Sequence, residues 1–404
     1  MMFIDGGVCA PAGFQANGIH CGIRKNKSKR DLALIVSEKR AVCAATYTTN
    51  LVKGAPLLVT KEHVADGYAT AIICNSGNAN TCNADGPAVA KKTCELLADA
   101  LNIPASDVVV ASTGVIGLPL DITPIQNGIP ALVSGLSTEN STAAEEAIMT
   151  TDTVEKEVAV RFMLGDVECH IGGIAKGSGM IHPNMATMLS FLTTDVAISH
   201  AMLQKALSTD VCDSFNMISI DGDTSTNDMV TLLANGMANN AEITDEGEAF
   251  DSFCAALHAV TTDLCRKIAG DGEGASKLLT CIVTGAAEKA TAVTVSKSVI
   301  CSSLVKAAMF GSDANWGRVL CAVGYSGADV DVNRIDVDFR SNVGTIAVCR
   351  NGAGVDFSEE LALQILQQSE VEILVDLHSG NVEATAWGCD LTYDYVKING
   401  DYRT

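Results

Sequence analysis

The sequence is poor in aromatic and in basic residues. Phe, Trp and Tyr make up 4% of its 404 residues, whereas 35 residues are glycine and 48% are hydrophobic. We therefore expect an aliphatic core with closely packed backbones. Lys and Arg number 27 against 48 Asp and Glu, so the formal net charge is −21. Because a polyanion repels phosphate backbones and anionic lipid headgroups, we expect no nucleic-acid partner and no membrane partner.

Long apolar runs and export signals are also missing. No stretch approaches the roughly 18 consecutive apolar residues of a membrane span, and no basic region precedes an apolar segment near Asp5. The densest basic stretch, residues 24–30, is short and contains no aromatic residue, so we interpret it as a solvated loop. These features predict a cytoplasmic protein.

The cysteine and histidine patterns do not indicate disulfides or a metal site. The 15 cysteines are odd in number, form no CxxC pair and stand singly in apolar runs such as residues 71–74. We expect small, reduced, mostly buried thiols. The seven histidines are scattered without an HExxH pattern. Cys169 and His170 are adjacent in an expected strand, so their side chains point to opposite faces and cannot share a metal ion.

Familiar catalytic and nucleotide-binding motifs are absent as well. The sequence has no GxSxG elbow and no GxxxxGK[ST] loop. Residues 270–274 (GDGEG) are rich in glycine, but they follow an expected helix, and their acidic side chains suit a cation better than a phosphate. We interpret them as a helix-terminating turn and expect no cofactor.

Strand and helix patterns alternate along the chain. Apolar, β-rich runs predict strands at residues 32–36, 56–60, 70–74, 108–112, 167–174, 278–283, 344–349 and 371–375. Ala90, Cys94, Leu97 and Leu101 recur at helical spacing, and a longer helix is predicted over residues 253–268. Many strands are apolar throughout, which indicates sheets covered on both faces. The predicted fold is α/β (α+β), a layered sandwich of β-sheets flanked by helices.

A glycine-rich segment carries the strongest chemical signal. Residues 172–190 (GGIAKGSGMIHPNMATMLS) contain one lysine and lead into Ala186-Thr187. A threonine hydroxyl can attack the preceding carbonyl, shift the acyl group from nitrogen to oxygen and, after hydrolysis, leave a free α-amine. That amine can then serve as the base for the same hydroxyl. Taken alone, however, the segment is also explained as a glycine-rich turn before an apolar strand.

Further motifs give this segment a context. The chain from Lys176 to Leu189 resembles the self-cleavage region of the ornithine acetyltransferase family, the ArgJ-type glutamate N-acetyltransferases of arginine biosynthesis. Other stretches match the same family in order: GGVCAP (6–11), NSGNAN (75–80), ASTGVIG (111–117), MTTDT (149–153), DGEGA (271–275), DANWGR (313–318) and NGDYRT (399–404). The resemblance therefore spans nearly the whole chain.

The resemblance implies a self-processing fold with an N-terminal nucleophile. The precursor would cut itself between Ala186 and Thr187 into an α chain, residues 1–186, and a β chain, residues 187–404. Thr187 would attack the acetyl carbonyl of N2-acetyl-L-ornithine, release ornithine and pass the acetyl group to L-glutamate in a ping-pong reaction. Thr113 and Gly114 would hold the oxyanion. Substrate contacts would come from Thr150, Lys176, Thr187, Glu273, Asn399 and Thr404.

The residues leave several alternatives open. A related amidase or aminopeptidase would use the same nucleophile but pass the acyl group to water, and a binding protein could keep the fold without processing. Use of acetyl-CoA as a second donor is not decided. An assembly of two α and two β chains is expected from the resemblance only. Residues 313–318 have no derived role, and Trp316 is interpreted as an anchor in the core.

Overall fold

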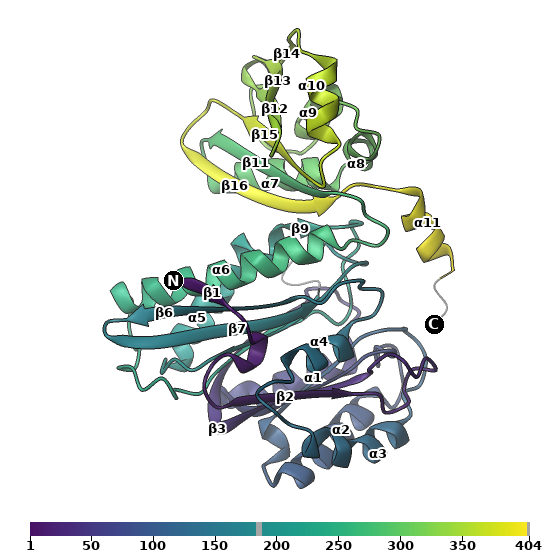
Figure 1. The fold of residues 1–404 in the computed structure, drawn as a ribbon, viewed down its shortest axis with the longest axis vertical. Helices are drawn as coiled ribbons and strands as arrows, with labels where there is room; N and C mark the ends of the chain where they lie inside the picture. Colours follow the sequence, from purple (N-terminus) through teal and green to yellow (C-terminus); the bar gives the residue numbers. More distant parts are fainter. Residues whose placement is uncertain (183–187, 402–404) are drawn as a thin grey trace.

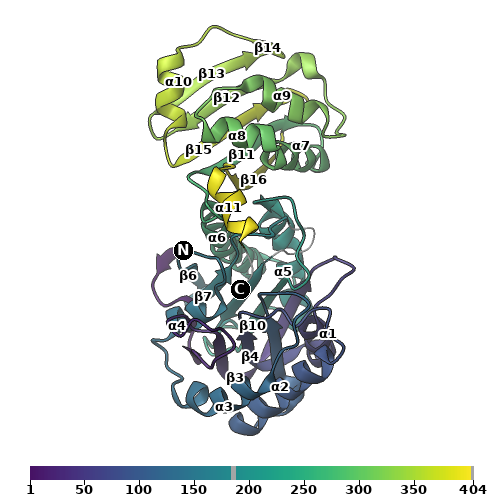
Figure 2. The same cartoon turned by 90° about the vertical axis from the view of Figure 1, so that its right-hand side faces the viewer.

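Two β-sheets stacked with helices between them form the molecule (Figure 1). The computed structural model describes residues 1–182 and 188–401. We call the nine-stranded sheet with helices α1–α6 the lower lobe, and the seven-stranded sheet with helices α7–α10 the upper lobe. Figure 2 shows the same two lobes from the side, joined through the region of α6.

The lower lobe is a mixed sheet with strand order β1-β6-β7-β8-β10-β3-β4-β5, and β2 pairs with β3. Its strands are β1 (Met2–Ile4), β2 (Phe14–Ile19), β3 (Leu32–Tyr47), β4 (Tyr68–Asn75), β5 (Val108–Ser112), β6 (Glu157–Leu164), β7 (Val167–Lys176), β8 (Leu189–Thr194) and β10 (Met229–Ala234). Strands β8 and β10 run parallel, with Leu189 opposite Met229.

Helices cover both faces of this sheet. They are α1 (Ala55–His63), α2 (Gly86–Leu101), α3 (Ile122–Ser134), α4 (Ser141–Ile148), α5 (His200–Asp213) and α6 (Glu248–Gly270). Successive residues of a strand point to opposite faces. Ile73 accordingly joins the cluster under α2 and α3, while its neighbour Ile72 joins the cluster that includes α4. Because both faces are covered, every residue of β5, β8 and β10 is buried, and so is every residue of β4 after its first.

The upper lobe follows the order β14-β13-β12-β15-β11-β16-β9. Its strands are β9 (Ile218–Ser219), β11 (Leu278–Ala286), β12 (Asp336–Ser341), β13 (Gly344–Arg350), β14 (Ala353–Gly354), β15 (Glu370–Asp376) and β16 (Val382–Cys389). Its helices are α7 (Lys289–Cys301), α8 (Ser303–Phe310), α9 (Trp316–Gly324) and α10 (Glu359–Leu366). Helix α6 contacts β6 and β7 of the lower sheet and also β11 and β16 of the upper sheet.

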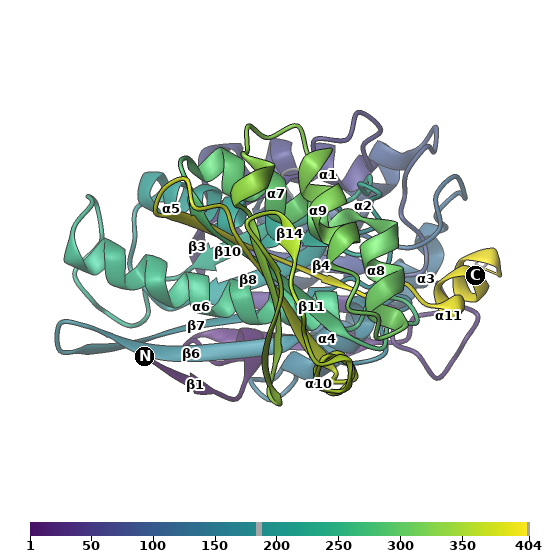
Figure 3. The ribbon, with the colours of Figure 1, turned by 90° about the horizontal axis from the view of Figure 1, so that it is seen from above.

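The last helix, α11 (Tyr393–Gly400), stands apart from both sheets. It descends from the end of β16 towards the lower lobe (Figure 1), and from above it projects at one edge of the molecule (Figure 3). None of its residues is buried. Hydrogen bonds hold it instead, because Thr392 Oγ1 donates to the Gly274 carbonyl and Tyr395 Oη donates to Asp221.

The layered α/β architecture predicted from the sequence is confirmed, with one error among the strands. Residues 56–60 are not a strand but lie in helix α1, where Pro56 occupies the first turn. Proline is tolerated there because the first N–H groups of a helix have no intrahelical partner. A five-residue apolar run does not distinguish a strand from a buried helix segment. The other seven predicted strands lie within observed strands.

Three smaller predictions have mixed outcomes. Residues 271–274 follow the end of α6, as the turn interpretation requires. Strand β15 alternates between buried and half-buried residues, so the expectation of sheets covered on both faces does not hold for this strand of the upper sheet. Trp316 is half-buried against the core at the start of α9, where the Asn315 side chain accepts a hydrogen bond from the Arg318 N–H.

Candidate active site

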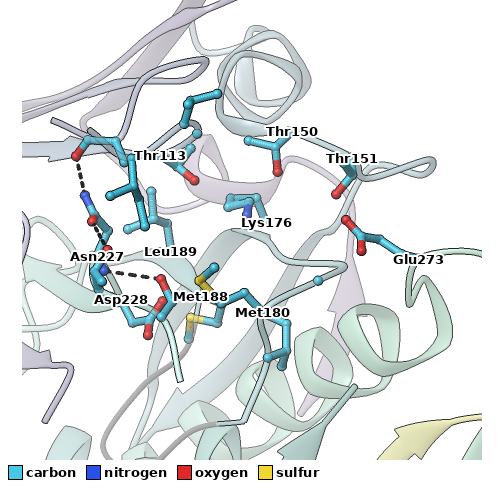
Figure 4. Close-up of a pocket in the computed structure, with 18 of the residues that line it drawn as sticks. Thr113, Thr150, Thr151, Lys176, Met180, Met188, Leu189, Asn227, Asp228 and Glu273 are labelled. Carbon is cyan, nitrogen blue, oxygen red and sulfur yellow. Dashed lines mark hydrogen bonds between the residues drawn. The ribbon is translucent and has the colours of Figure 1, made fainter. Parts of the chain in front are cut away.

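A cavity of about 300 Å³ brings together most of the site residues predicted from the sequence (Figure 4). Six of them line it: Thr113, Gly114, Thr150, Lys176, Glu273 and Asn399. Ala186, Thr187 and Thr404 lie outside the described residues. Met188 and Leu189, which follow Thr187 directly in the chain, also line the cavity. Segments that are far apart in the sequence thus surround the two residues that follow the predicted cleavage site.

A tight turn after strand β5 forms one wall. Thr113 N–H donates to the Asn75 carbonyl at 2.9 Å, which fixes the start of the turn. Gly114 has φ +128, and a Cβ there would lie 2.4 Å from the Gly77 carbonyl carbon and 2.6 Å from the Asn78 nitrogen. Only glycine fits a backbone approach this close. The Thr113–Gly114 turn is therefore held against the loop 77–78 and faces the cavity.

Lys176 supplies a cation to the cavity at the end of β7. It is 8% exposed, and within the described ranges no side chain is hydrogen-bonded to its ammonium. Asp152 lies behind it. Burial opposes the ionisation of Asp152, but the charges of Lys176 and Lys156 outweigh burial and lower the Asp152 pKa. Because Asp152 is engaged by Lys156 and by the Gly177 N–H, the Lys176 ammonium is available to an anionic ligand.

Glu273 supplies the opposite charge, and the C-terminal helix closes over it. The Glu273 side chain is 7% exposed, and its carboxylate accepts a hydrogen bond from Asn399 Nδ2 at 2.6 Å. A Cβ on Gly179 would lie 2.5 Å from the Glu273 carboxyl carbon, so the glycine allows the loop after β7 to pass close by. The cavity thus contains an available ammonium and a carboxylate on different elements.

Thr150 and its neighbours connect these charged groups. Thr150 N–H donates to Asp152 Oδ2 at 2.9 Å, and the hydroxyls of Thr151 and Ser178 are 2.6 Å apart. Thr151 lines the cavity but was not predicted as a site residue, although it lies in the motif that contains Thr150. Figure 4 shows the side chains of Thr150 and Thr151 between Lys176 and Glu273, where their hydroxyls can donate to or accept from a polar ligand.

The loop before β10 was missed by the sequence analysis altogether. Asn227 and Asp228 line the cavity. Asn227 Nδ2 donates to the carbonyls of Ala79 and Ser112, at 2.6 and 2.9 Å, and thereby ties this loop to the chain just before the Thr113–Gly114 turn. A usable signal was present, because residues 221–228 (DGDTSTND) form a polar stretch directly before an apolar strand.

The described part of the chain contains no metal-binding cluster and no single helix that could span a membrane. Among residues 1–182 and 188–401, no three His, Cys, Asp or Glu side chains are grouped so that they could hold a metal ion. No single helix of these ranges has the length and apolar composition to cross a membrane, although the bent pair α7 and α8 meets both criteria jointly. Both helices bury part of their residues in the core.

Comparisons with known proteins agree on one family. The model of the ArgJ family matches residues 15–404. Arginine biosynthesis bifunctional protein ArgJ 1 of Clostridium acetobutylicum is 51% identical over 97% of this chain and 96% of its own length. The crystal structure of the ArgJ protein from Bacillus halodurans is 48% identical, covers 54% of this chain and 100% of its own, and gives a TM-score of 0.51. The ornithine acetyltransferase of Mycobacterium tuberculosis, solved in complex with ornithine, is 36% identical over 46% of this chain and 99% of its own, with a TM-score of 0.43.

Fold, cavity and relatives together define an acyltransferase of arginine biosynthesis. The chain belongs to the ArgJ family.

Proposed function

We propose that this enzyme transfers the acetyl group of N2-acetyl-L-ornithine to L-glutamate through an acetyl ester on Thr187. The observation that carries the proposal is the cavity lined by Met188, which combines the tight Thr113–Gly114 turn, an available ammonium and a carboxylate. Thr187 precedes Met188 in the chain. Its hydroxyl would attack the acetyl carbonyl, and donors at Thr113 and Gly114 would stabilise the developing negative charge.

Self-cleavage before Thr187 is part of the proposal. The relative from Clostridium acetobutylicum aligns over 97% of this chain. The solved Bacillus halodurans chain aligns over its whole length, but that length covers only 54% of this chain. A cut after Ala186 leaves a C-terminal fragment of 404 − 186 = 218 residues, which is also 54% of 404. The length of the solved chain therefore supports a β chain of residues 187–404.

The two fragments would remain associated after the cut. Strand β7 of the α fragment pairs antiparallel with β8 of the β fragment, and β3 pairs antiparallel with β10. The β-fragment strands β8 and β10 are thus inserted between α-fragment strands. Separating the fragments would break both ladders and expose the apolar faces of four strands, which is strongly unfavourable.

The two charged groups suit amino-acid substrates. Lys176 would bind the α-carboxylate that acetylornithine and glutamate share, and Glu273 would bind the cationic side chain of ornithine. Asn399, which already donates to Glu273, would hold that carboxylate in place. Thr150 and Thr404 would complete the substrate contacts. No cofactor is needed for acyl transfer through a threonine ester.

Replacing Glu273 with glutamine tests this division of roles. We expect the KM for acetylornithine to rise by roughly 10- to 100-fold, because a charge-assisted hydrogen bond is lost while the side-chain shape is kept. The control is the second half-reaction, in which glutamate collects the acetyl group from preformed acetyl-enzyme and its rate should stay within a few-fold of the wild-type value. Unchanged acetylornithine kinetics would refute the role of Glu273.

A pair of glycine substitutions tests the oxyanion turn. Gly114→Ala should lower kcat by roughly 10²-fold or more, because the added Cβ collides with the Gly77 backbone and displaces a donor to the oxyanion. Gly117→Ala is the matched control. Gly117 also has positive φ, at +81, but among the described residues no atom would lie within 4 Å of a Cβ added there, so backbone strain is tested without a collision. Equal losses in the two variants would contradict the assignment.

A hydrolase that passes the acyl group to water is the competing activity. The two are separated by incubating the enzyme with acetylornithine and measuring ornithine release with and without glutamate. Sustained release that requires glutamate supports acetyl transfer, whereas release independent of glutamate supports hydrolysis. Adding acetyl-CoA with glutamate, and measuring N-acetylglutamate, decides whether this enzyme also uses that donor.

Location and assembly complete the proposal. We propose a cytoplasmic enzyme, which the free thiols of all 15 cysteines and the net charge of −21 support. Two α and two β chains would form the assembly. Sedimentation of the purified enzyme measures this stoichiometry directly.

A further inference from the structure

Asp228 is aligned in the sheet with Met188, the residue that follows the predicted nucleophile in the chain. In the parallel pair of β8 and β10, Met229 is opposite Leu189, and Met229 N–H donates to the Met188 carbonyl at 3.0 Å. Asp228 is therefore aligned with Met188, the residue that follows Thr187 in the chain. Figure 4 shows the Asp228 side chain beside that of Met188, and both line the cavity.

The Asp228 carboxyl group is buried without a full set of partners. Its residue is 3% exposed, and in the described part of the chain Oδ2 has no hydrogen-bond partner. A buried carboxylate with an unpaired oxygen is costly, so such a group is normally neutral or paired with a cation. Burial raises the Asp228 pKa well above its usual value, against the opposing effects of a Ser225 hydrogen bond and the Lys176 charge.

Few other charged groups lie near the Asp228 carboxyl group. Lys176 and Glu273 are the other titratable groups among the described residues that line the cavity. Asp152 lies behind Lys176 and is paired with Lys156, and Tyr47 ends the neighbouring strand β3, opposite Met229. Lys176 is thus the cation that acts on Asp228 in the intact chain, and it does not bond to the free oxygen.

We propose that Asp228 is the receptor for the amino terminus that self-cleavage creates at Thr187. This inference rests on the proposed cut between Ala186 and Thr187. In the intact chain residue 187 has an amide nitrogen, which carries no charge, and Asp228 is a neutral acid. Cleavage replaces the amide with a basic amine one residue from the position aligned with Asp228. The buried carboxyl then gains the cationic partner that it lacks.

The proton balance of this change is simple. Water hydrolyses the ester formed by the nitrogen-to-oxygen shift, which breaks the acyl C–O bond and gives the Ala186 carboxyl group and the Thr187 hydroxyl with its free amine. The Asp228 proton passes to that amine, so an ammonium–carboxylate pair replaces a neutral acid and a neutral amine. Before acetyl transfer the ammonium gives this proton to solvent, and the neutral amine can then accept the Thr187 hydroxyl proton. Asp228 then stabilises the ammonium that forms, and so acts as a positioning residue through the amine.

The test compares Asp228→Asn with the wild-type enzyme. Asparagine has the shape of the neutral acid, so we expect normal folding and normal cleavage on a denaturing gel. The mature variant should lose roughly 10²-fold in kcat, because the ammonium is no longer stabilised. Loss of the negative charge also lowers the amine pKa, so the acidic limb of the kcat/KM profile should move to lower pH by about one unit or more.

A matched variant controls for the loss of a buried carboxylate. Asp195 follows the other end of β8, is 1% exposed and accepts hydrogen bonds from His170 and Ala12, away from the cavity. Asp195→Asn should keep the wild-type pH profile. A cut Asp228→Asn enzyme with wild-type kcat and pH profile would overturn the inference, and so would an Asp228→Asn chain that stays uncut while the wild-type chain is cut. A wild-type chain that is never cut would instead refute the proposed function.

Discussion

Replacing Thr187 with alanine is expected to leave one uncut chain of 404 residues that transfers no acetyl group. Both results follow from the loss of the Thr187 hydroxyl oxygen. The hydroxyl oxygen is the group that attacks the Ala186 carbonyl during processing and the acetyl carbonyl during turnover. Without it neither ester forms, and we expect kcat to fall by at least roughly 10⁴-fold, the scale seen when a nucleophile is removed.

Two further variants separate chemistry from folding. Thr187→Ser keeps a hydroxyl and should still be cut, although the loss of the methyl group frees the side-chain rotamer and slows both reactions. Thr187→Ala should show the circular dichroism spectrum and denaturation midpoint of a folded protein. A Thr187→Ala chain that is cut after residue 186, or that transfers acetyl groups at the wild-type rate, would contradict the role of Thr187.

The largest expected effect on stability comes from Lys156. Its ammonium is fully buried and lies 2.8 Å from Asp152 Oδ1 and 2.6 Å from Asp271 Oδ2. Burial disfavours the Lys156 ammonium, but the two carboxylates outweigh it and raise the Lys156 pKa. Lys156→Met removes the cation and leaves two buried carboxylates near each other. Removing one partner of a buried ion pair typically costs about 3–5 kcal/mol of unfolding free energy.

The same cluster connects the two proposed fragments and supports the active site. Asp152 and Lys156 belong to residues 1–186, whereas Asp271 belongs to residues 187–404. Asp152 also accepts the Gly177 N–H and lies behind Lys176. Urea denaturation followed by circular dichroism measures the loss. The matched control is Lys91→Met, which removes an exposed lysine paired with Glu62 and should change the unfolding free energy by less than about 1 kcal/mol. Equal effects of the two substitutions would contradict this account.

Much of the fold could be predicted because buried segments are mostly apolar, and apolar runs can be recognised in the sequence. Residues 108–112 are apolar except for the final Ser112, and strand β5 has the same bounds, with its alternate residues buried in the two clusters on opposite faces of the sheet. Residues 56–60 show the limit of that signal. They are equally apolar and short, and only the neighbouring residues up to His63, which complete two helical turns, distinguish helix α1 from a strand.

The site was predictable to the extent that its residues lie in recognisable motifs. Thr113, Lys176 and Glu273 come from three distant motifs, and the fold places them around one cavity. Asn227 and Asp228 were missed because a polar loop before a strand is common, and only the pairing of β8 with β10 brings this loop to Met188. The burial of Asp228 depends on tertiary packing and has no trace in the local sequence.

Self-cleavage before Thr187, which would free the amine of the proposed nucleophile, can be tested directly on the purified protein. Purified wild-type protein should be separated on a denaturing gel, and the amino terminus of each band should be sequenced. We expect two bands, of 186 and 404 − 186 = 218 residues, with the longer fragment beginning Thr-Met-Leu-Ser. A single full-length band that persists after long incubation, in a preparation that still transfers acetyl groups from acetylornithine to glutamate, would contradict it.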